Sequence, residues 1–534
     1  MKKIFSILMV CAVAVTATAV PARRDGVVRT LEDGTEVTVY QNGDENFHYL
    51  TNEAGEWYEQ NTEGQLKRIP ALSEEQVIAR RESGKYAQAQ ARRIRKAQQE
   101  TGVSRLLAPK GAVLLVQFSD TKFTYSKESM IEWATGENYT VGGATGSIRE
   151  YFYDQSFGQY NLQLDVYGPY TISKAASYYG GNDSGGSDQH PDEMVQEACK
   201  LAIADGVDFT QYDYDNDGYV DWVVTVYAGK GEADSDDEST IWPHQYELSY
   251  TGKTVKQGNK TIDHYCCVNE INGQGGGRAG IGVFVHEFSH ILGLPDLYTT
   301  NYATQKTLGE WDIMDYGPYN NDLKTPPAYS AYERWWMGWL EPTLLNSAAS
   351  VTMPYLSTSK AAAYITTNGE AISNILSPGG NDFYILENRQ KIKWDAHIPG
   401  HGLLITKIHY KYNWWRNNTV NNTASSMGVD LLEADSKAPS QSSANPNNGY
   451  YGKAGDAFPQ GATSYSGITG YPITGITENN QTITFDVAGG GTPITLGMES
   501  IFPEDGKPVK FMQNGLFYFF RNGKIYDMNG RLIY

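Results

Sequence analysis

Buried strands and an amphipathic helix alternate in the middle of the chain. Residues 113–118 form a continuous apolar run bounded by Pro and Gly, which predicts a buried strand. The stretch MVQEACKLAIADG places its apolar residues on one helical face and ends at Gly206, and YVDWVVTVYAG predicts a second buried strand. This mixture of strand and helix predicts an α/β or α+β domain, which we place at residues 109–345.

Shorter alternating runs flank this domain on both sides. Residues 26–69 alternate apolar and polar positions between Asp-Gly, Asn-Gly and Ala-Gly turns, which predicts a small set of hairpins. Runs such as DFYILENRQ and QTITFDVAGG predict a β-sandwich-like region at residues 346–490. A glycine-rich break then precedes a predicted β-hairpin tail at residues 491–534, whose final KIYDMNGRLIY resembles a Bacteroidetes secretion (sorting) signal.

A secretory signal is predicted at the start of the chain. A short basic start precedes an apolar stretch, and small residues suited to signal cleavage stand before Arg23: Ala17, Ala19 and Ala22. We assign residues 1–22 to the signal peptide and expect the mature chain to leave the cytoplasm. Because a basic helical run separates the hairpins from the first buried strand, residues 23–108 are interpreted as a pro-segment whose exposed end is cut on activation.

Composition narrows the classes of partner. The chain carries 62 Asp and Glu against 43 Lys and Arg, a net charge of -19, which argues against nucleic acid or anionic membrane as partners and favours bound cations. No apolar run after the signal approaches the roughly 20 residues that a spanning helix needs. Only Cys199, Cys266 and Cys267 follow the signal, so we expect no disulfide framework.

One apolar stretch, VFVHEFSHILGLPDLY (residues 283–298), contains two histidines and two acids, although buried charge is costly unless it is paired or bound to metal. His286 and His290 are four residues apart, so on a helix they project from one face and can bind one ion. Zinc binds imidazole nitrogen well, and a catalytic zinc keeps one position open for water, whose pKa it lowers. Glu287 is then placed to take the proton of that water.

Further residues are candidates for the same site. Gly293 lets the chain leave the helix through a left-handed turn, and Asp296 follows at a distance at which a third ligand can fold back. Two carboxylates more distant in the sequence, Glu333 and Glu387, are alternative third ligands. Metzincin-type metalloproteases place a methionine turn beneath the zinc histidines, and Met314 in GEWDIMDYG stands where that turn would fall.

The chain resembles the M6 family of secreted zinc metallopeptidases, the immune inhibitor A-like group, and its Bacteroidetes members in particular. Similar stretches lie between about residues 109 and 410 and include KGAVLLVQFSD, YDYDNDGYVDWVVTVYAGKGEA, TIWPHQYEL and SAYERWWMGWLEP. The resemblance implies an α+β zincin-like (metzincin-like) catalytic domain and a zinc endopeptidase made as a secreted zymogen. Tyr316 matches the position from which some metzincins hold a tyrosine near the zinc to stabilise the oxyanion.

Latency in such a zymogen cannot depend on a thiolate. Residues 23–108 contain no cysteine, so no thiolate of this segment can occupy the open zinc position. An acid, His48 or simple blockage of the site must provide latency instead.

A second cation site is predicted in YDYDNDGYVD. Calcium prefers oxygen ligands, which this loop offers at alternate positions around the turn at Gly218: Asp213, Asp215, Asp217, the Tyr219 carbonyl and Asp221. Val224 stands where an EF-hand loop has its bidentate Glu, so the loop is expected to be EF-hand-like and closed by Asp221. We expect bound calcium to order the loop and to slow self-digestion.

These observations predict a zinc-dependent endopeptidase that hydrolyses extracellular proteins and is secreted or held at the cell surface or in the periplasm of a bacterium. His286, His290 and Asp296 would hold zinc, and Glu287 would act as general base and later as general acid. One alternative is a peptidase directed at glycoproteins such as mucin. Another is a non-catalytic, metal-bound binding or adhesion protein, against which Glu287 argues because a closed structural zinc site has no use for a base.

Overall fold

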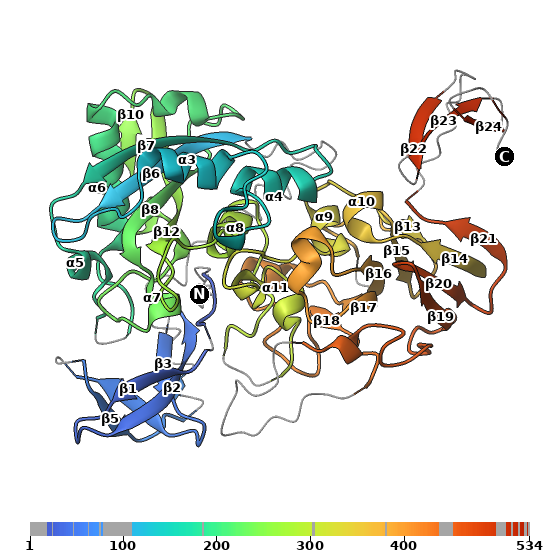
Figure 1. The fold of residues 1–534 in the computed structure, drawn as a ribbon, viewed down its shortest axis with the longest axis horizontal. Helices are drawn as coiled ribbons and strands as arrows, with labels where there is room; N and C mark the ends of the chain where they lie inside the picture. The colour runs from blue at the N-terminus through green and yellow to red at the C-terminus, as the bar shows by residue number, and fades with distance from the viewer. Residues whose placement is uncertain are drawn as a thin grey trace, which may run out of the picture.

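The computed structural model describes residues 19–77, apart from 24, 46, 62–63 and 74–75, and residues 109–497, apart from 184–185, 302–304, 380–381 and 437–451. It also describes residue 531 and the backbone of three C-terminal strands: β22 (Val509–Gln513), β23 (Leu516–Arg521) and β24 (Lys524–Asp527). The predicted signal before Ala19 and the basic run from residue 78 to residue 108 lie outside the described residues. Figure 1 shows a small N-terminal sheet, a mixed α/β part and a β-rich C-terminal part.

The first sheet, here called the N-terminal sheet, is an antiparallel meander. Its strands pair in chain order: β1 (Val27–Thr30), β2 (Glu36–Asp44), β3 (Phe47–Thr51), β4 (Trp57–Gln60) and β5 (Leu66–Ile69). Its small core contains Val39, Leu50, Tyr58 and Leu66. The predicted hairpins are thereby confirmed, and the core is small because alternate residues of these strands face solvent.

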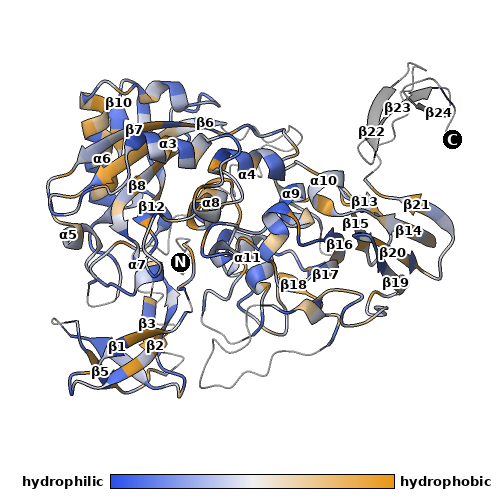
Figure 2. Ribbon diagram, viewed as in Figure 1, coloured by the Kyte–Doolittle hydropathy of each residue, from blue (hydrophilic) through white to orange (hydrophobic). Residues whose placement is uncertain are grey.

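A five-stranded mixed sheet forms the centre of the α/β part, as predicted from its apolar runs. Its order is β7 (Gln163–Thr171), β6 (Lys110–Gln117), β8 (Val223–Lys230), β12 (His264–Ile271) and β9 (His244–Glu247). The first four strands run parallel, and β9 pairs antiparallel with β12. Strand β8 is hydrophobic along most of its length (Figure 2), which fits a strand covered on both faces.

Alternate residues of β6 enter two different cores because side chains of a strand alternate between its faces. Leu114 and Val116 pack in a core with helix α6 (Pro191–Ala204), whereas Val113 and Leu115 pack in a core with helix α8 (Gly282–Ile291). The other α-helices are short: α3 (Lys127–Thr135), α4 (Ile148–Gln155), α5 (Ala176–Gly180), α7 (Glu232–Ser235), α9 (Ala331–Trp336), α10 (Leu356–Ser359) and α11 (Tyr412–Arg416).

Short hairpin strands and single turns of 3₁₀ helix complete the described elements of this part and of the loops that follow it. The hairpin consists of β10 (Val255–Gln257) and β11 (Lys260–Ile262). The 3₁₀ helices are η1 (Val141–Gly143), η2 (Phe209–Tyr212), η3 (Leu248–Tyr250), η4 (Gly309–Trp311), η5 (Gly317–Tyr319), η6 (Lys393–His397) and η7 (Ala454–Asp456).

Two sheets with a common core form the C-terminal part. One contains β13 (Thr343–Leu344), β15 (Ala362–Thr366), β16 (Phe383–Arg389), β17 (Gly402–Ile408) and β18 (Val429–Leu431). The other contains β19 (Ile473–Asn479), β20 (Thr482–Val487), β14 (Ala349–Met353) and β21 (Thr492–Thr495). Strand β21 follows the boundary predicted after residue 490 but pairs with β14, so this strand belongs to the C-terminal part and not to the tail.

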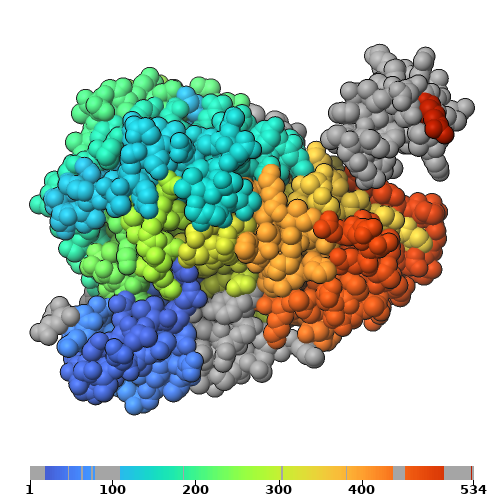
Figure 3. All heavy atoms as spheres, in the orientation of Figure 1, coloured from blue at the N-terminus to red at the C-terminus, as the bar shows by residue number. Residues whose placement is uncertain are grey.

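The α/β and C-terminal parts are joined by continuous packing. The core around α8 extends to Tyr364, Phe383 and Trp415 of the C-terminal part. A buried ion pair lies at the same junction, where Arg389 contacts Asp395 and donates from its guanidinium to the Ala328 carbonyl at 3.0 Å. Figure 3 shows the N-terminal sheet as a separate lobe against the α/β part, whereas the α/β and C-terminal parts meet over a broad front.

Candidate metal centre and active site

Helix α8 carries both histidines of the apolar motif into the interior. Residues 282–290 of this helix are all buried, so the helix is anchored on every side. His286 Nδ1 lies 2.8 Å from the Ile313 carbonyl oxygen, and His290 Nδ1 lies 2.8 Å from the Leu294 carbonyl oxygen. Because each Nδ1 donates to a carbonyl, each Nε2 keeps its lone pair for a metal.

Glycines fit α8 into its place at two points. A Cβ atom on Gly282 would lie 1.9 Å from the Pro318 carbonyl oxygen, so only glycine lets η5 approach the start of the helix. Gly293 has φ +97°, a left-handed conformation that turns the chain back after the helix, as the sequence predicts. The turn brings Asp296 to the histidines.

Three acceptor atoms converge at this point. Asp296 Oδ1 lies 3.2 Å from His286 Nε2 and 3.3 Å from His290 Nε2, and the two Nε2 atoms are 3.1 Å apart. Ligands around a tetrahedral zinc with bonds of 2.0–2.1 Å are about 3.4 Å apart, which these distances approach. Since all three side chains are buried, a cation held between them would satisfy their lone pairs.

The Asp296 carboxylate is held from the C-terminal part of the chain. Asn418 donates from Nδ2 to Asp296 Oδ2 and accepts the Asp296 backbone N–H at 2.7 Å through Oδ1. Burial raises the pKa of Asp296, but the neighbouring His290 and His286 outweigh burial and hold that pKa well below its usual range. The carboxylate is therefore charged and fixed in orientation.

The alternative carboxylates lie elsewhere. Glu333 accepts from the Ser330 backbone and hydroxyl at 2.7 and 2.9 Å, in a capping box at the start of α9. Glu387 accepts the Ala331 N–H at 2.7 Å and lies beside Arg389. The group of acids and histidines within 4.8 Å of one another contains Asp296 and neither of these glutamates.

The Met314 turn lies directly against the histidine helix. The residue before it supplies the carbonyl that orients His286, and the Met314 carbonyl accepts the Leu297 N–H at 2.8 Å. Met314 is fully buried in the core that contains α8. Tyr316 is also buried, and its ring centroid is 6.4 Å from that of Tyr298.

Residues 19–23, here called the N-terminal segment, pack against this site. The Val20 N–H donates to Glu287 Oε1 at 2.7 Å, and the Tyr298 hydroxyl donates to the Ala19 carbonyl at 2.6 Å. Ala19, Val20 and Ala22 are almost fully buried. Burial raises the pKa of Glu287 well above its usual range. The peptide bond between residues 19 and 20 therefore lies beside the predicted catalytic glutamate.

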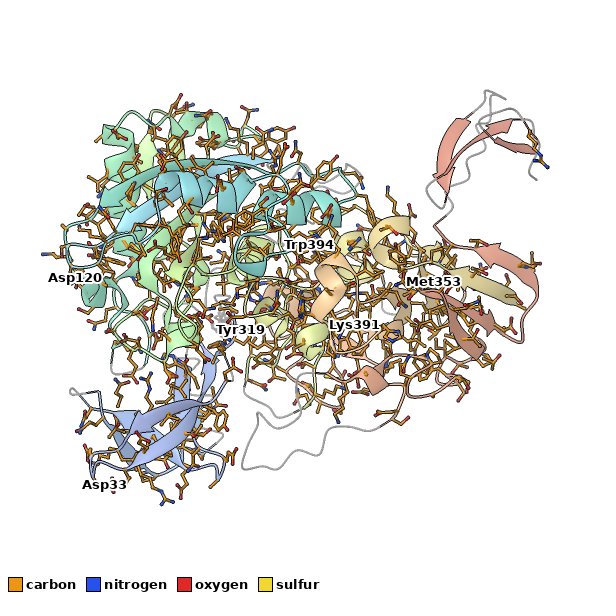
Figure 4. All side chains as sticks on the ribbon, viewed as in Figure 1. Asp33, Asp120, Tyr319, Met353, Lys391 and Trp394 are labelled. Carbon is orange, nitrogen blue, oxygen red and sulfur yellow. The ribbon has the colours of Figure 1, made fainter. Side chains whose placement is uncertain are left out.

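The α/β part holds the backbone of the N-terminal segment at three more points. The Trp242 indole donates to the Val20 carbonyl at 3.0 Å, and the Tyr319 hydroxyl donates to the Pro21 carbonyl at 2.5 Å. The Arg23 N–H donates to the Ala233 carbonyl at 2.7 Å. Tyr319 lies near the centre of the molecule, above the N-terminal sheet (Figure 4).

The sequence did not identify these contact residues, although one carries a signal. Tyr298 follows Asp296 by two residues and so lies at a fixed distance from the zinc motif. Trp242 stands in TIWPHQYEL, noted for another reason, and Tyr319 follows GEWDIMDYG by two residues. Asn418 stands in an asparagine-rich loop without a recognisable pattern.

The predicted calcium loop brings three of its acids together. Ligand atoms of Asp213, Asp215 and Asp217 lie within 4.8 Å of one another. Asp221 is outside that group, and its Oδ2 accepts the Tyr214 N–H at 2.6 Å. The ammonium of Lys260 contacts Asp213. The loop therefore offers carboxylates for a cation, but the ammonium of Lys260 already places one positive charge beside them.

Comparison with known proteins finds similarity to a family of peptidases. Residues 110–339 match the catalytic domain of the immune inhibitor A peptidase M6 family. The pre-pro-metalloprotease PrtV of Vibrio cholerae is 29% identical over 228 residues, which cover 37% of this chain and 24% of PrtV. Immune inhibitor A of Bacillus thuringiensis is 24% identical over 265 residues, which cover 41% of this chain and 38% of that protein.

A protein of Arthroderma benhamiae whose name describes a secreted metallopeptidase is 22% identical over 207 residues, 33% of this chain and 29% of its own length. The chain thus spans between about a quarter and two fifths of the relatives it matches. Among the described residues, the longest apolar helices are too short to cross a membrane.

Proposed function

We propose that this protein, whose residues 110–339 match the catalytic domain of the M6 peptidases, is an exported zinc endopeptidase that acts on extracellular proteins and is made as a zymogen. The observation that carries the proposal is the convergence of His286, His290 and Asp296 next to Glu287, which itself contacts a peptide N–H. A structural zinc site would be closed by a fourth protein ligand, whereas here the neighbour is a base.

The side chains around the site divide the reaction between them. A zinc ion held by His286, His290 and Asp296 would supply a Lewis acid for the scissile carbonyl and for the attacking water. Glu287 accepts a proton from that water and then delivers it to the leaving amine, whose position the Val20 nitrogen marks. The Tyr298 hydroxyl donates to the carbonyl oxygen on the other side of the same bond. Tyr316 stays a second candidate for holding that oxygen.

Latency is proposed to come from the N-terminal segment. Its residues from Val20 to Arg23 lie where the carboxyl-side part of a substrate would lie beside Glu287, whereas His48 lies on β3 and its Nε2 is 2.7 Å from Glu232 Oε1. Blockage of the site therefore explains latency better than binding of His48 to the zinc does. The name of PrtV, a pre-pro-metalloprotease, is consistent with a zymogen.

We place the signal cleavage after Ala19 rather than after Ala22. Ala17 and Ala19 form the small-x-small pattern that signal peptidases read, and residues 20–22 contact the catalytic part instead of standing free. Cleavage there would leave the α-amino group of Val20 beside Glu287. Residues 20–108 would then be the pro-segment.

We also propose that Asp213, Asp215 and Asp217 bind a calcium ion that has a structural role.

Metal removal tests the proposal. Dialysis of the processed protein against a strong chelator is expected to abolish hydrolysis of a quenched fluorescent casein. Zinc is expected to restore hydrolysis, while calcium alone is expected to restore only resistance to self-digestion, seen as survival of the intact chain on a gel. Casein hydrolysis that survives complete removal of zinc would show that the site is not a zinc peptidase.

A further inference from the structure

We propose that the peptidase binds a basic side chain of its substrate at the place where the structure holds Arg23, the fourth residue on the carboxyl side of the cleaved bond. The proposal rests on the peptidase function proposed above and adds the substrate preference. The site that would bind this side chain consists of Asn272, Tyr319 and Asp322, here called the Arg23 site.

The register follows from the contacts of the N-terminal segment. Glu287 touches the nitrogen of the bond between residues 19 and 20, and Tyr298 touches the carbonyl oxygen of Ala19. A catalytic glutamate must reach the leaving nitrogen, so this bond occupies the place of the scissile bond. Val20 is then the first residue after the cut, and Arg23 is the fourth.

The guanidinium of Arg23 contacts one acid of its own stretch and two side chains far away in the sequence. Its Nε donates to Asp25 Oδ2 at 2.7 Å, its Nη2 is 3.0 Å from Asp322 Oδ1, and its Nη1 is 3.3 Å from Asn272 Oδ1. The guanidinium carbon lies 5.9 Å from the centre of the Tyr319 ring. The Arg23 side chain is only 11% exposed, so most of it leaves water in this place. A planar, forked cation suits this set of two oxygens and one ring.

The Arg23 site is built within the α/β part. Asn272 donates from Nδ2 to Asp322 Oδ1 at 2.8 Å, which fixes the carboxylate without any help from the N-terminal segment. Asp322 itself lies in a tight turn with φ 54°, and Lys324 lies 3.2 Å from its other oxygen. A second carboxylate, the buried Asp234, accepts the Gly273 N–H at 2.8 Å and adds to the negative field at Arg23.

Most other contacts of the segment involve groups that every peptide shares. Trp242, Tyr319 and Ala233 bond to backbone atoms of the segment. The side chains at Val20 and Ala22 are small and apolar, so they carry no charge that the site could read. Charge complementarity is therefore concentrated at Arg23. When the segment leaves, Asp322 and Asn272 keep their positions and meet the corresponding residue of a substrate.

The test is a competition in one tube. A library of short peptides with mixed sequence is digested by the full chain after its natural processing, and the cut peptides are sequenced by mass spectrometry. The ratio of Arg to Gln at the fourth position after the cut, corrected for the uncut library, does not depend on how much enzyme is active. A largely buried Arg paired with a partly exposed carboxylate is expected to enrich Arg about tenfold.

Variants of one carboxylate decide the assignment. Asp322→Asn is expected to reduce the Arg-to-Gln ratio to about one, and Asp322→Lys is expected to bring the ratio below one and to enrich Glu. Asn272→Ala, which removes one contact, is expected to lower the ratio about threefold. Asp205 is an exposed acid at the end of α6. The variant Asp205→Asn is the matched control and should keep the wild-type ratio.

The outcomes separate this inference from the proposed function. Cleavage without Arg enrichment in the wild type, or enrichment that persists in Asp322→Asn, would overturn the Arg23 site while leaving the peptidase intact. If no peptide is cut by zinc-loaded protein, the peptidase function itself fails and the inference fails with it.

Discussion

At the scale of single residues, Asp296 connects the metal site to a distant part of the chain. Its side chain and backbone both bond to Asn418, which is 122 residues away in the sequence. Asn418 has φ 52° and its carbonyl accepts from the Thr300 hydroxyl at 2.7 Å, so its own position is well defined. A neighbour that orients a ligand in this way raises metal affinity without touching the metal.

Loss of Asn418 should therefore weaken zinc binding. Asn418→Ala is expected to lower the zinc affinity about 10- to 100-fold, because the Asp296 carboxylate loses its orienting donor. Competition for zinc between the protein and a chromophoric chelator measures the affinity. Asn422→Ala is the matched control, since Asn422 accepts the Thr300 N–H at 2.8 Å in the same loop without contacting Asp296. Equal affinities of Asn418→Ala and the wild type would exclude this role.

Residues close in sequence were predictable because their geometry is local. Two histidines four apart on a helix must share a face, and Gly293 permits the turn that returns Asp296. The contacts of Glu287 with Val20 and of Tyr298 with Ala19 join residues 267 and 279 positions apart. They involve backbone atoms of the segment, which have no sequence signature, so the pattern of residues could not reveal them.

At the scale of elements, the central strands and helix α6 follow from their apolar periodicity, and the structure confirms both. Strand β6 is apolar on both faces because it lies between two cores. A continuous apolar run in the sequence indicates a strand of this kind. Helix α8 is apolar on almost every side. Its sequence therefore indicates a buried helix and not an amphipathic one.

Pairing between strands was less predictable than the strands themselves. The glycine-rich break before β21 indicated a boundary, yet β21 forms a parallel ladder with β14, nearly 150 residues earlier in the chain. Register between distant strands depends on packing of the finished core, here with Val351 and Ile494 as paired residues, and not on local sequence.

At the scale of the whole molecule, the N-terminal sheet docks on acidic groups of the α/β part. His48 pairs with Glu232, and the Arg29 guanidinium lies 3.0 Å from Asp236. Further acids face this contact: Asp188, Glu238 and, from the N-terminal side, Glu45. The N-terminal sheet and the N-terminal segment belong to one stretch of chain, so weakening the contact of the sheet should loosen the segment.

The contact between the N-terminal sheet and the α/β part should weaken at alkaline pH. Burial lowers the pKa of His48, but Glu232 and Glu238 outweigh burial and raise that pKa to about 9 from an ordinary value of 6.5. The stabilisation, on the order of 3 kcal/mol, is complete below about pH 6.5 and is lost as the pH rises through about 9. Between pH 7 and 10 the wild type should therefore lose stability.

Thermal unfolding of the wild type and of His48→Gln measures this loss. The variant keeps a neutral hydrogen-bonding side chain, so it should be less stable than the wild type at pH 7 and similar to it at pH 10. Lysines and tyrosines that titrate in the same range affect both proteins alike. Parallel losses of stability in the two proteins between pH 7 and 10 would rule out His48 as the titrating group.

The central claim is that Glu287 is the catalytic base of a zinc peptidase, and one paired measurement tests it most directly. The rate of quenched casein hydrolysis is measured for the processed wild type and for Glu287→Gln, with bound zinc quantified in both. The account predicts equal zinc content and a rate lower by about a thousandfold in the variant, because a general base contributes roughly 10²–10⁴. A zinc-loaded variant that cleaves casein as fast as the wild type would contradict it.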